Sequence, residues 1–409
     1  MTPPPQRGGQ DRLMKSPAEK ELDEARRLAN TSTLNRLASK LKADPAADLT
    51  QTLKQQADAY PQLRRGLEQA AREKAAARGS GSGSESESRS AGPSDTQLRP
   101  FFAEGPVEII HALDRRITAL LGLTDPQNAA ELATRVNEAI EHAEVLWRLH
   151  ETVVLGLGPS VVVKIGTSLD ADEVENLRYI NAHVPDVPAP SSLGCLRAGR
   201  KTYHFMSRAA GVTLESVWAD LSAEHKASVK AQLDSVFCSL RKERGGGGSS
   251  SQKYFGGFVS AICKDTRRHQ RLSEPRIQTE TQFNDFLCRK PGRDPTPWIA
   301  MLRSGMRNDH RLVMTHGDLH PRNIMVRWEP RDEDEANLNM CGEGKGIRIT
   351  ALIDWEMSGW YPEYWEFVKA LSINPRGKLS DWFEYLPTDA IGTWPVELAI
   401  DSLLDRSLA

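Results

Sequence analysis

A short polar loop between two apolar segments carries the residues of this chain best suited to chemistry. The flanks, Leu312–Met314 and Ile324–Val326, are rich in strand formers. Between them lie Asp318 and Asn323, five positions apart. At this spacing a carboxylate can accept the proton of an attacking hydroxyl, while the amide oxygen holds a magnesium ion. The loop therefore indicates chemistry on a phosphoryl group, presented on a rigid strand scaffold.

A second carboxylate stands at the end of a later strand. The apolar segment Ile349–Ile353 is followed directly by Asp354. Magnesium takes few oxygen ligands from protein, because it keeps waters and binds phosphate oxygens. Asn323 and Asp354 meet that demand, so we expect them to share one metal. The connection Glu329–Gly346 is longer than a hairpin needs and rich in acids, so we expect a solvated surface insertion at a hairpin tip.

These motifs resemble those of a known superfamily. HGDLHPRN at His316–Asn323, followed by IDWE at Ile353–Glu356, is similar to the loops of aminoglycoside phosphotransferases and choline kinases. The run Trp360–Glu366 resembles the many uncharacterised fungal members. The resemblance covers the chain from about Leu146 to the C-terminus. It implies a two-lobed, protein-kinase-like α+β fold, with a small antiparallel-sheet N-lobe and a mostly helical C-lobe.

The resemblance also implies a reaction and its cofactors, ATP and Mg²⁺. The γ-phosphoryl group would move to a hydroxyl of a small hydroxylated molecule, with Asp318 as the catalytic residue that positions it. Asn323 and Asp354 would hold the metal. One alternative is a pseudokinase that serves as a binding or scaffold module. A protein kinase is less favoured, because the sequence has no DFG and no APE segment.

Four further residues receive nucleotide-binding roles from the resemblance. Lys164, in an apolar strand-like run, would hold the α- and β-phosphates. Its partner would be Glu173, which has the spacing to a following leucine seen in related members. Glu175 is the alternative, since residues two apart on a helix diverge and only one can face the lysine. The backbone near Ser207 and Ala209 would form the hinge that binds adenine.

The remaining polar residues of the loop allow a zinc hypothesis. His316 and His320 are four apart, but the zinc motif with that spacing requires a helix. We therefore expect His316 to bond the backbone near Asp354 and His320 to support Asp318. From charge alone, Arg322 is expected to pair with a carboxylate such as Glu363 or Glu366.

Composition divides the chain into three parts. The first is polar, with helices expected to break near Pro45 and Pro61, and it ends in a Gly/Ser-rich linker, Gly79–Asp95. Its large apolar residues are too sparse for a core, so we expect a disordered or weakly helical extension. The predicted ranges are 1–98 for this extension, 99–206 for a helical lead-in and N-lobe, and 207–409 for the C-lobe.

The lead-in and the first strands have local signals of their own. Apolar spacing predicts a helix over Pro106–Leu121. Asp125 is the expected N-cap of a second helix, whose apolar side would reach Trp147. Strands are expected on either side of Gly156–Pro159. This turn lacks GxGxxG spacing, so a plain hairpin is preferred and the phosphate-covering loop is not placed.

Global composition excludes several classes of protein. The formal net charge is −2, which gives no nucleic-acid footprint. No apolar run approaches the ~20 residues of a membrane span, and the N-terminus lacks a signal-peptide core. The cysteines are scattered and odd in number, as in a reduced, cytoplasmic protein. The oligomeric state is not indicated. Four tryptophans near the C-terminus are expected in the core rather than in a carbohydrate platform: Trp360, Trp365, Trp382 and Trp394.

Overall fold

The chain forms two compact units, Met1–Ser90 and Ala91–Ala409. The structure is a computed structural model that describes 48–79, 98–123, 125, 128–149, 151–167, 169, 171–242, 254–265, 271–274, 276–289, 294–330, 345–372 and 379–408, with positions 22, 26, 30 and 33. Most of the predicted Gly/Ser linker and of the acidic insertion lies outside these residues. Among the described helices, none combines the length and apolar character that a membrane crossing needs.

The first unit is built on one long helix, α2 (Thr50–Gly79). The predicted break at Pro61 is wrong, because the helix runs through this proline. An interior proline loses one hydrogen bond and its ring crowds the carbonyl of the preceding turn, but its φ is helical, so the turns on either side can continue the helix. The Arg65 side chain donates to the Pro61 carbonyl at 3.1 Å. The Arg26 guanidinium contacts Glu68 of α2 at 2.8 Å within the same unit.

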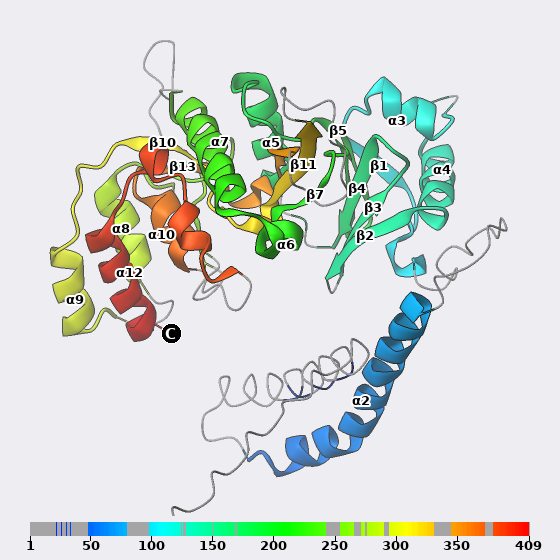
Figure 1. Cartoon of the computed structure of the whole chain (residues 1–409), viewed down its shortest axis with the longest axis horizontal. Coiled ribbons are helices and arrows are strands. Elements are labelled where there is room, and N and C mark those ends of the chain that lie inside the picture. Colours follow the sequence, from blue (N-terminus) through cyan, green and yellow to red (C-terminus); the bar gives the residue numbers. More distant parts are fainter. Residues whose placement is uncertain are drawn as a thin grey trace, which may run out of the picture. The chain divides into compact units, whose positions relative to one another are not determined.

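The second unit begins with a six-stranded antiparallel sheet in the order β1-β5-β6-β4-β3-β2 (Figure 1). Its strands are β1 (Val107–His111), β2 (Glu144–Leu149), β3 (Thr152–Gly156), β4 (Val161–Gly166), β5 (Ser192–Ala198) and β6 (Lys201–Ser207). The helices of this lobe are α3 (Arg115–Leu120), α4 (Ala129–Glu141) and α5 (Ala171–His183). The predicted hairpin around Gly156–Pro159 is confirmed as β3 and β4.

The predicted lead-in helix is wrong in its first half. Residues 107–111 form β1, which pairs with β5 and extends the sheet by one strand, and only the short α3 follows. The cap of the next helix is also displaced. Asn128, not Asp125, accepts the amides of Ala130 and Glu131 and begins α4. Trp147 lies on edge strand β2 and is 48% exposed, so it is not part of the buried side of α4.

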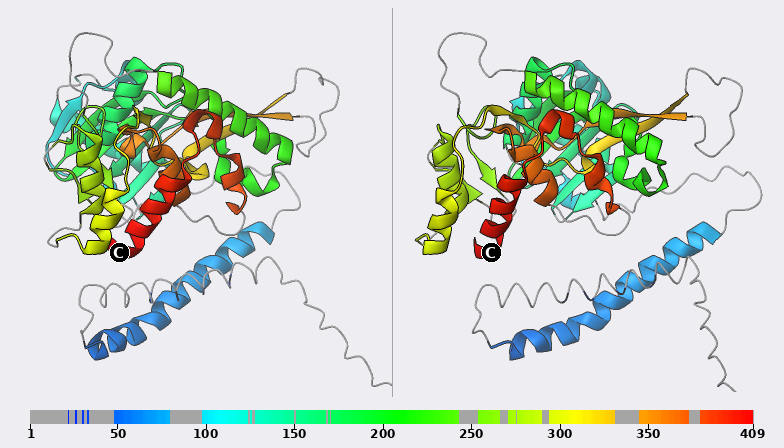
Figure 2. Two further views of the ribbon diagram at one scale, coloured as in Figure 1. Left: turned by 90° about the vertical axis from the view of Figure 1, so that its left-hand side faces the viewer. Right: turned by 60° about the vertical axis from the view of Figure 1, so that its left-hand side comes forward.

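The second lobe combines small sheets with helices (Figure 1). Strands β11 (Ile324–Pro330) and β12 (Lys345–Leu352) form a hairpin, and β7 (Val212–Thr213) pairs with β11 as the third strand of this sheet. In a separate sheet, β10 (Leu312–Thr315) pairs with β13 (Gly359–Pro362). Figure 2 shows the β11–β12 hairpin extending away from the helices. The remaining elements are α6 (Leu214–Val217), α7 (Ala223–Lys242), β8 (Lys264–Asp265), β9 (Arg271–Leu272), α8 (Glu280–Cys288), α9 (Pro297–Ser304), α10 (Trp365–Ser372), α11 (Thr388–Ile391) and α12 (Pro395–Leu408).

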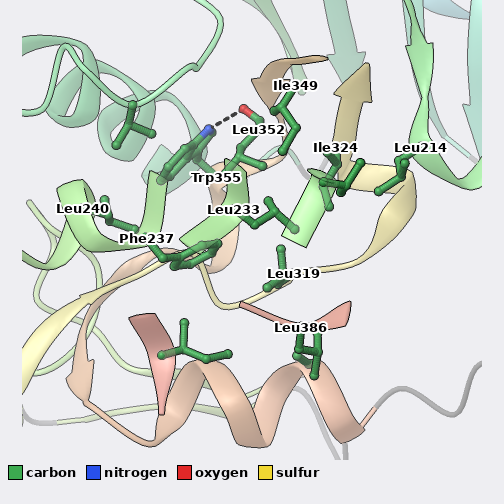
Figure 3. Packing of buried hydrophobic residues seen from close by; sticks show 14 of the residues in the cluster. Leu214, Leu233, Phe237, Leu240, Leu319, Ile324, Ile349, Leu352, Trp355 and Leu386 are labelled. Carbon is green, nitrogen blue, oxygen red and sulfur yellow. Dashed lines mark hydrogen bonds between the residues drawn. The ribbon is translucent and has the colours of Figure 1, made fainter. Parts of the chain in front are cut away.

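One hydrophobic cluster supports the strands that flank the polar loop. Leu233 and Phe237 of α7 pack with Ile324 at the start of β11 (Figure 3). Trp355 is buried beside them, and its indole N–H donates to the Leu352 carbonyl at 2.9 Å. Leu319, next to Asp318, lies in the same cluster. Each such side chain contributes roughly 1.5–3 kcal/mol by burial, so the cluster holds the loop in one conformation.

The aromatic residues near the C-terminus also pack inside. Trp360, Trp365 and Trp382 are buried, and Trp394 packs against two of the hydrophobic clusters. This confirms the prediction that they are core residues. The expected mixed α+β fold, with an antiparallel-sheet lobe and a mostly helical lobe, is likewise confirmed.

Candidate active site

Lys164 of β4 stands between two carboxylates. Its Nζ lies 2.8 Å from Oε1 of Glu173 in α5 and 3.3 Å from Oδ1 of Asp354. Glu175, the alternative partner, instead contacts His111 of β1 at 2.8 Å. The predicted lysine–glutamate pair is therefore present, and the same lysine reaches the end of β12 in the other lobe.

Burial and charge act against each other at this pair. Burial would lower the pKa of Lys164, but Glu173 and Asp354 outweigh it and raise that pKa above its usual value. Burial raises the pKa of Glu173, an effect that Lys164 partly offsets. The second carboxylate oxygen of Glu173, Oε2, is buried and has no hydrogen-bond partner among the residues that the structure describes. A buried oxygen left in this state is available to a bound cation or water.

Asp354 adopts a backbone conformation that L-residues rarely adopt. Its φ and ψ are 68° and 66°, in the left-handed region, and the 3-10 turn Trp355–Met357 follows. Non-glycine residues in this region cluster at ligand sites, because the surrounding structure must hold them there. Asn176 of α5 does so here, since its amide donates to the carbonyls of Trp355 and Ser358 at 3.0 and 2.8 Å.

Asn323 connects the two acidic segments. Its Nδ2 donates to Oδ2 of Asp318 at 2.7 Å and to the Asp318 carbonyl at 2.9 Å. Its own carbonyl accepts the Ile353 amide at 2.9 Å, directly before Asp354. With the amide nitrogen used by Asp318, the side-chain Oδ1 is the atom left to bind a metal.

Arg322 corrects one expectation from the sequence. It pairs with neither Glu363 nor Glu366. Its Nη2 lies 3.0 and 3.3 Å from the two carboxylate oxygens of Asp318. Burial would raise the pKa of Asp318, but Arg322, with smaller effects from His316 and Lys369, lowers it overall. Asp318 is therefore ionised at neutral pH.

Glu366 serves the backbone of the loop instead. This fully buried carboxylate of α10 accepts the amide of His316 at 2.7 Å and that of Gly317 at 3.2 Å. Glu363 pairs with Arg311 at 2.6 Å. Sequence reasoning missed the role of Glu366, because nothing local to the WYPEYWE run shows which backbone it meets.

The two loop histidines have structural contacts. His316 Nε2 lies 3.1 Å from the Ile353 carbonyl, which confirms the expected bond near Asp354. His320 does not bond Asp318 as expected. Its Nδ1 accepts the Arg322 amide at 3.1 Å and caps the turn Pro321–Asn323. Burial lowers the pKa of His320 to about 4, so this acceptor is neutral at neutral pH.

A third acid lies beside Glu173 and Asp354. Oxygens of Glu173, Asp354 and Glu356 lie within 4.8 Å of one another, the single group of this kind among the described residues. The loop histidines do not belong to it. All three donors are hard oxygens, which suit Mg²⁺, and the partnerless Glu173 oxygen lies in the same place. The residues therefore fit a magnesium ion. Glu356 was not predicted, although it is the second acid of IDWE.

The predicted hinge residues follow the sheet. Ser207 ends β6, and its amide donates to the Ser191 carbonyl at 2.9 Å, so that N–H is not available to a base. Ala209 lies in the extended segment beyond the strand. Both residues line a cavity of about 410 Å³ together with Arg208, Arg327 and Arg348. Lys164, Asp318, Asn323 and Asp354 do not line it, so this cavity is separate from the cluster above.

Comparison with known proteins identifies the family. The profile of the phosphotransferase enzyme family matches residues 167–397, more than half of the chain. The chain belongs to this family. The match includes Glu173, Asp318, Asn323 and Asp354, while Lys164 lies three positions ahead of it. No curated protein sequence matches this phosphotransferase-family chain.

Solved structures of aminoglycoside phosphotransferases are similar at low identity. A thermostable APH(4)-Ia mutant with ADP and hygromycin B has 18% identity and a TM-score of 0.41, covering 64% of this chain and 83% of its own. The streptomycin–ATP–APH(2'')-IIa complex has 11% identity and a TM-score of 0.40, covering 68% and 85%. ADP-bound APH(2'')-Ib has 12% identity and a TM-score of 0.40, and the match covers 68% of this chain and 86% of that protein. The assignment to the phosphotransferase family depends on the profile and not on these similarities.

Proposed function

We propose that this protein is an ATP-dependent small-molecule kinase that moves the γ-phosphoryl group of ATP to a hydroxyl with the help of Mg²⁺. One observation carries the proposal. Lys164 of the sheet lobe contacts Asp354 at 3.3 Å, and Asn323 connects the Asp354 segment to Asp318. These contacts link four groups suited to phosphoryl transfer, and this linkage supports the proposal.

The reaction forms one P–O bond and breaks another at the γ-phosphorus. The acceptor oxygen bonds to the γ-phosphorus, the bond to the β,γ-bridging oxygen breaks, ADP leaves, and the hydroxyl proton passes to the Asp318 carboxylate. Because its pKa is lowered, Asp318 is ionised and mainly orients the hydroxyl. Asn323 fixes the rotamer of that carboxylate through its 2.7 Å hydrogen bond. A late proton transfer suits a loose transition state, so a strong base is not required.

The remaining site residues would neutralise the negative charge of the ATP phosphates. Lys164, kept cationic by Glu173, would neutralise the α- and β-phosphates. Asp354 and Asn323, with Glu356 and Oε2 of Glu173, are the residues that would hold Mg²⁺. Its charge would lower the cost of the developing anion. Asp354 contacts Lys164 in this structure, so nucleotide binding requires the lysine to exchange a carboxylate for phosphate oxygens.

Thermal unfolding of the full chain with and without MgATP tests the proposal. Saturation to 100 times Kd stabilises a protein by about 2.7 kcal/mol, which for a chain of this size is a rise in Tm of roughly 3–4 °C. Asp354→Ala should abolish the part that depends on Mg²⁺. Asp309→Ala, an exposed aspartate paired with Arg307, should keep it. If the intact protein shows no Mg²⁺-dependent shift, the kinase proposal fails and a pseudokinase is favoured. ADP release with choline, amino sugars, homoserine and ribose-type acceptors then measures turnover.

A further inference from the structure

Arg322 contacts the carboxylate that, in the proposed reaction, receives the acceptor hydroxyl. The two residues share one loop, and Arg322 Nη2 contacts both carboxylate oxygens, at 3.0 and 3.3 Å. The Asp318 side chain is only 20% exposed, whereas that of Arg322 is 48% exposed. Of the two paired side chains, the guanidinium is thus the one more open to solvent. Because Nη2 contacts both oxygens of Asp318, a hydroxyl that binds this carboxylate would share it with the cation or displace the cation.

Positively charged side chains act on the Asp318 carboxylate. Beside Arg322, the buried Lys369 of α10 is a second cation that lowers the pKa of this carboxylate. Glu366 lies behind the loop with its oxygens used by backbone amides. Glu215 of α6 approaches His320, at 4.0 Å. The site therefore presents a positive group, not a row of acids, next to the catalytic carboxylate.

A positive group here favours one acceptor chemistry. A guanidinium binds a carboxylate or phosphate with two parallel hydrogen bonds, and these charge-assisted bonds are stronger than neutral ones. An anionic acceptor gives Arg322 a new partner and so frees Asp318 for its hydroxyl. A cationic acceptor leaves Arg322 on Asp318 and adds repulsion. A neutral polyol has no anionic group that could replace Asp318 as the partner of Arg322.

We propose that Arg322 is a specificity-determining residue that selects acceptors bearing an anionic group within a few bonds of the reacting hydroxyl. The close spacing of Arg322 and Asp318 limits the class to hydroxy acids, sugar acids and phosphorylated polyols. This inference rests on the proposed kinase function, and it names the substrate class. Loss of one charged hydrogen-bonding partner is expected to raise KM for such acceptors by about 10- to 100-fold.

Acceptor pairs matched in shape test the proposal on the full-length protein. ADP release is measured with glycerate and glycerol 3-phosphate against glycerol, and with gluconate against glucose, so that the carboxylate and phosphate arms are separate. Choline and glucosamine are the cationic arm. The intact protein should prefer at least one anionic arm. Arg322→Gln should raise KM for that arm alone, and Arg322→Lys should lie between. Arg135→Gln, at an exposed arginine of α4 paired with Glu138, is the matched control and should leave KM unchanged for every acceptor.

Two results overturn the inference and leave the kinase proposal standing. One is equal or better turnover of neutral or cationic acceptors by the intact protein. The other is an Arg322→Gln variant whose kcat falls equally for every acceptor while KM for MgATP rises, which would place the guanidinium on the nucleotide phosphates. If no acceptor turns over, binding of the same anions to the MgADP-loaded protein replaces the rate, and an affinity independent of Arg322 rejects the inference. Absence of MgATP binding rejects the kinase function, and the acceptor class with it.

Discussion

Lys164 and Asp354 are 190 positions apart in the chain and lie 3.3 Å apart in the structure. One residue belongs to a central strand of the six-stranded sheet and the other to the turn after β12. The contact joins the two lobes at the site where we propose that ATP binds. Glu173 contacts the same lysine at 2.8 Å, so the cation lies between two carboxylates.

Lys164→Met should damage both stability and transfer. It leaves the Glu173 carboxylate buried without its cation, which costs about 3–5 kcal/mol. It also removes the charge proposed to hold the phosphates, so ADP release should fall by about 100-fold or more. Urea unfolding and the ADP assay measure the two effects. The double variant Lys164→Met/Glu173→Gln is the control: it should recover most of the stability and none of the transfer. A double variant as unstable as the single one would contradict the buried-charge explanation.

Glu366→Gln should loosen the loop that carries Asp318. The amide keeps the size of the side chain but replaces one acceptor oxygen with a donor, which faces the N–H groups of His316 or Gly317. A buried donor–donor contact costs about 1–3 kcal/mol. Chemical unfolding should show this loss together with a lower kcat. Glu363→Gln, three positions earlier and paired with the exposed Arg311, should cost less than about 1 kcal/mol. Equal effects of the two substitutions would sink the loop-anchor role.

Gly317→Ala should strongly lower the unfolding free energy, because the backbone at this position of the loop suits only glycine. Gly317 has φ of +79°, and an added Cβ would lie 2.5 Å from the Met357 carbonyl oxygen. Left-handed strain costs about 1–3 kcal/mol, and the overlap adds to it. The matched control is Gly305→Ala, where the nearest atom would be 3.5 Å away. Its expected change in unfolding free energy is small, within about 1 kcal/mol. Comparable losses at both positions would contradict this account.

His204 should make stability fall as the solution is acidified. Burial, reinforced by Lys164, His111 and Arg178, lowers its pKa from 6.5 to about 3. Below pH 6.5 the unfolded chain therefore takes up a proton that the folded protein refuses until about pH 3. The unfolding free energy should drop by up to about 1.4 kcal/mol per pH unit within that window, and this contribution is absent above pH 6.5.

Unfolding by urea at pH 7.5, 6.5, 5.5 and 4.5 measures that slope. His204→Gln removes the titrating group and should flatten the profile relative to the intact protein. His142→Gln, at an exposed position after α4, should leave the slope as it is. Parallel profiles for the intact protein and His204→Gln would show that this histidine does not limit stability in acid.

The loop chemistry was predictable because it is local. Asp318 and Asn323 are five positions apart and lie between short apolar strands, so their proximity needs no distant contact. The left-handed turn at Asp354 and the approach of Glu356 were not visible in the sequence. They depend on Asn176 of α5, about 180 positions earlier, which binds the carbonyls of Trp355 and Ser358 just after Asp354.

The wrong helix over Pro106–Leu121 has a related cause. Apolar residues there fit a helical period, but short apolar segments fit a strand as well. Residues 107–111 form a strand because they pair with β5, almost ninety residues later. That pairing also brings His111 to Glu175 and so leaves Glu173 as the partner of Lys164.

By itself, the sequence determined which functional groups the protein has and which local frames present them: an Asp and an Asn in one tight loop, a lysine in an apolar strand, an acid after another. Only the tertiary structure decided how those charges pair, with Arg322 on Asp318, Glu366 on the loop amides and Lys164 between two carboxylates. The reason is physical. Electrostatic and hydrogen-bond energies depend on separation in space and on burial, and neither is a function of distance along the chain.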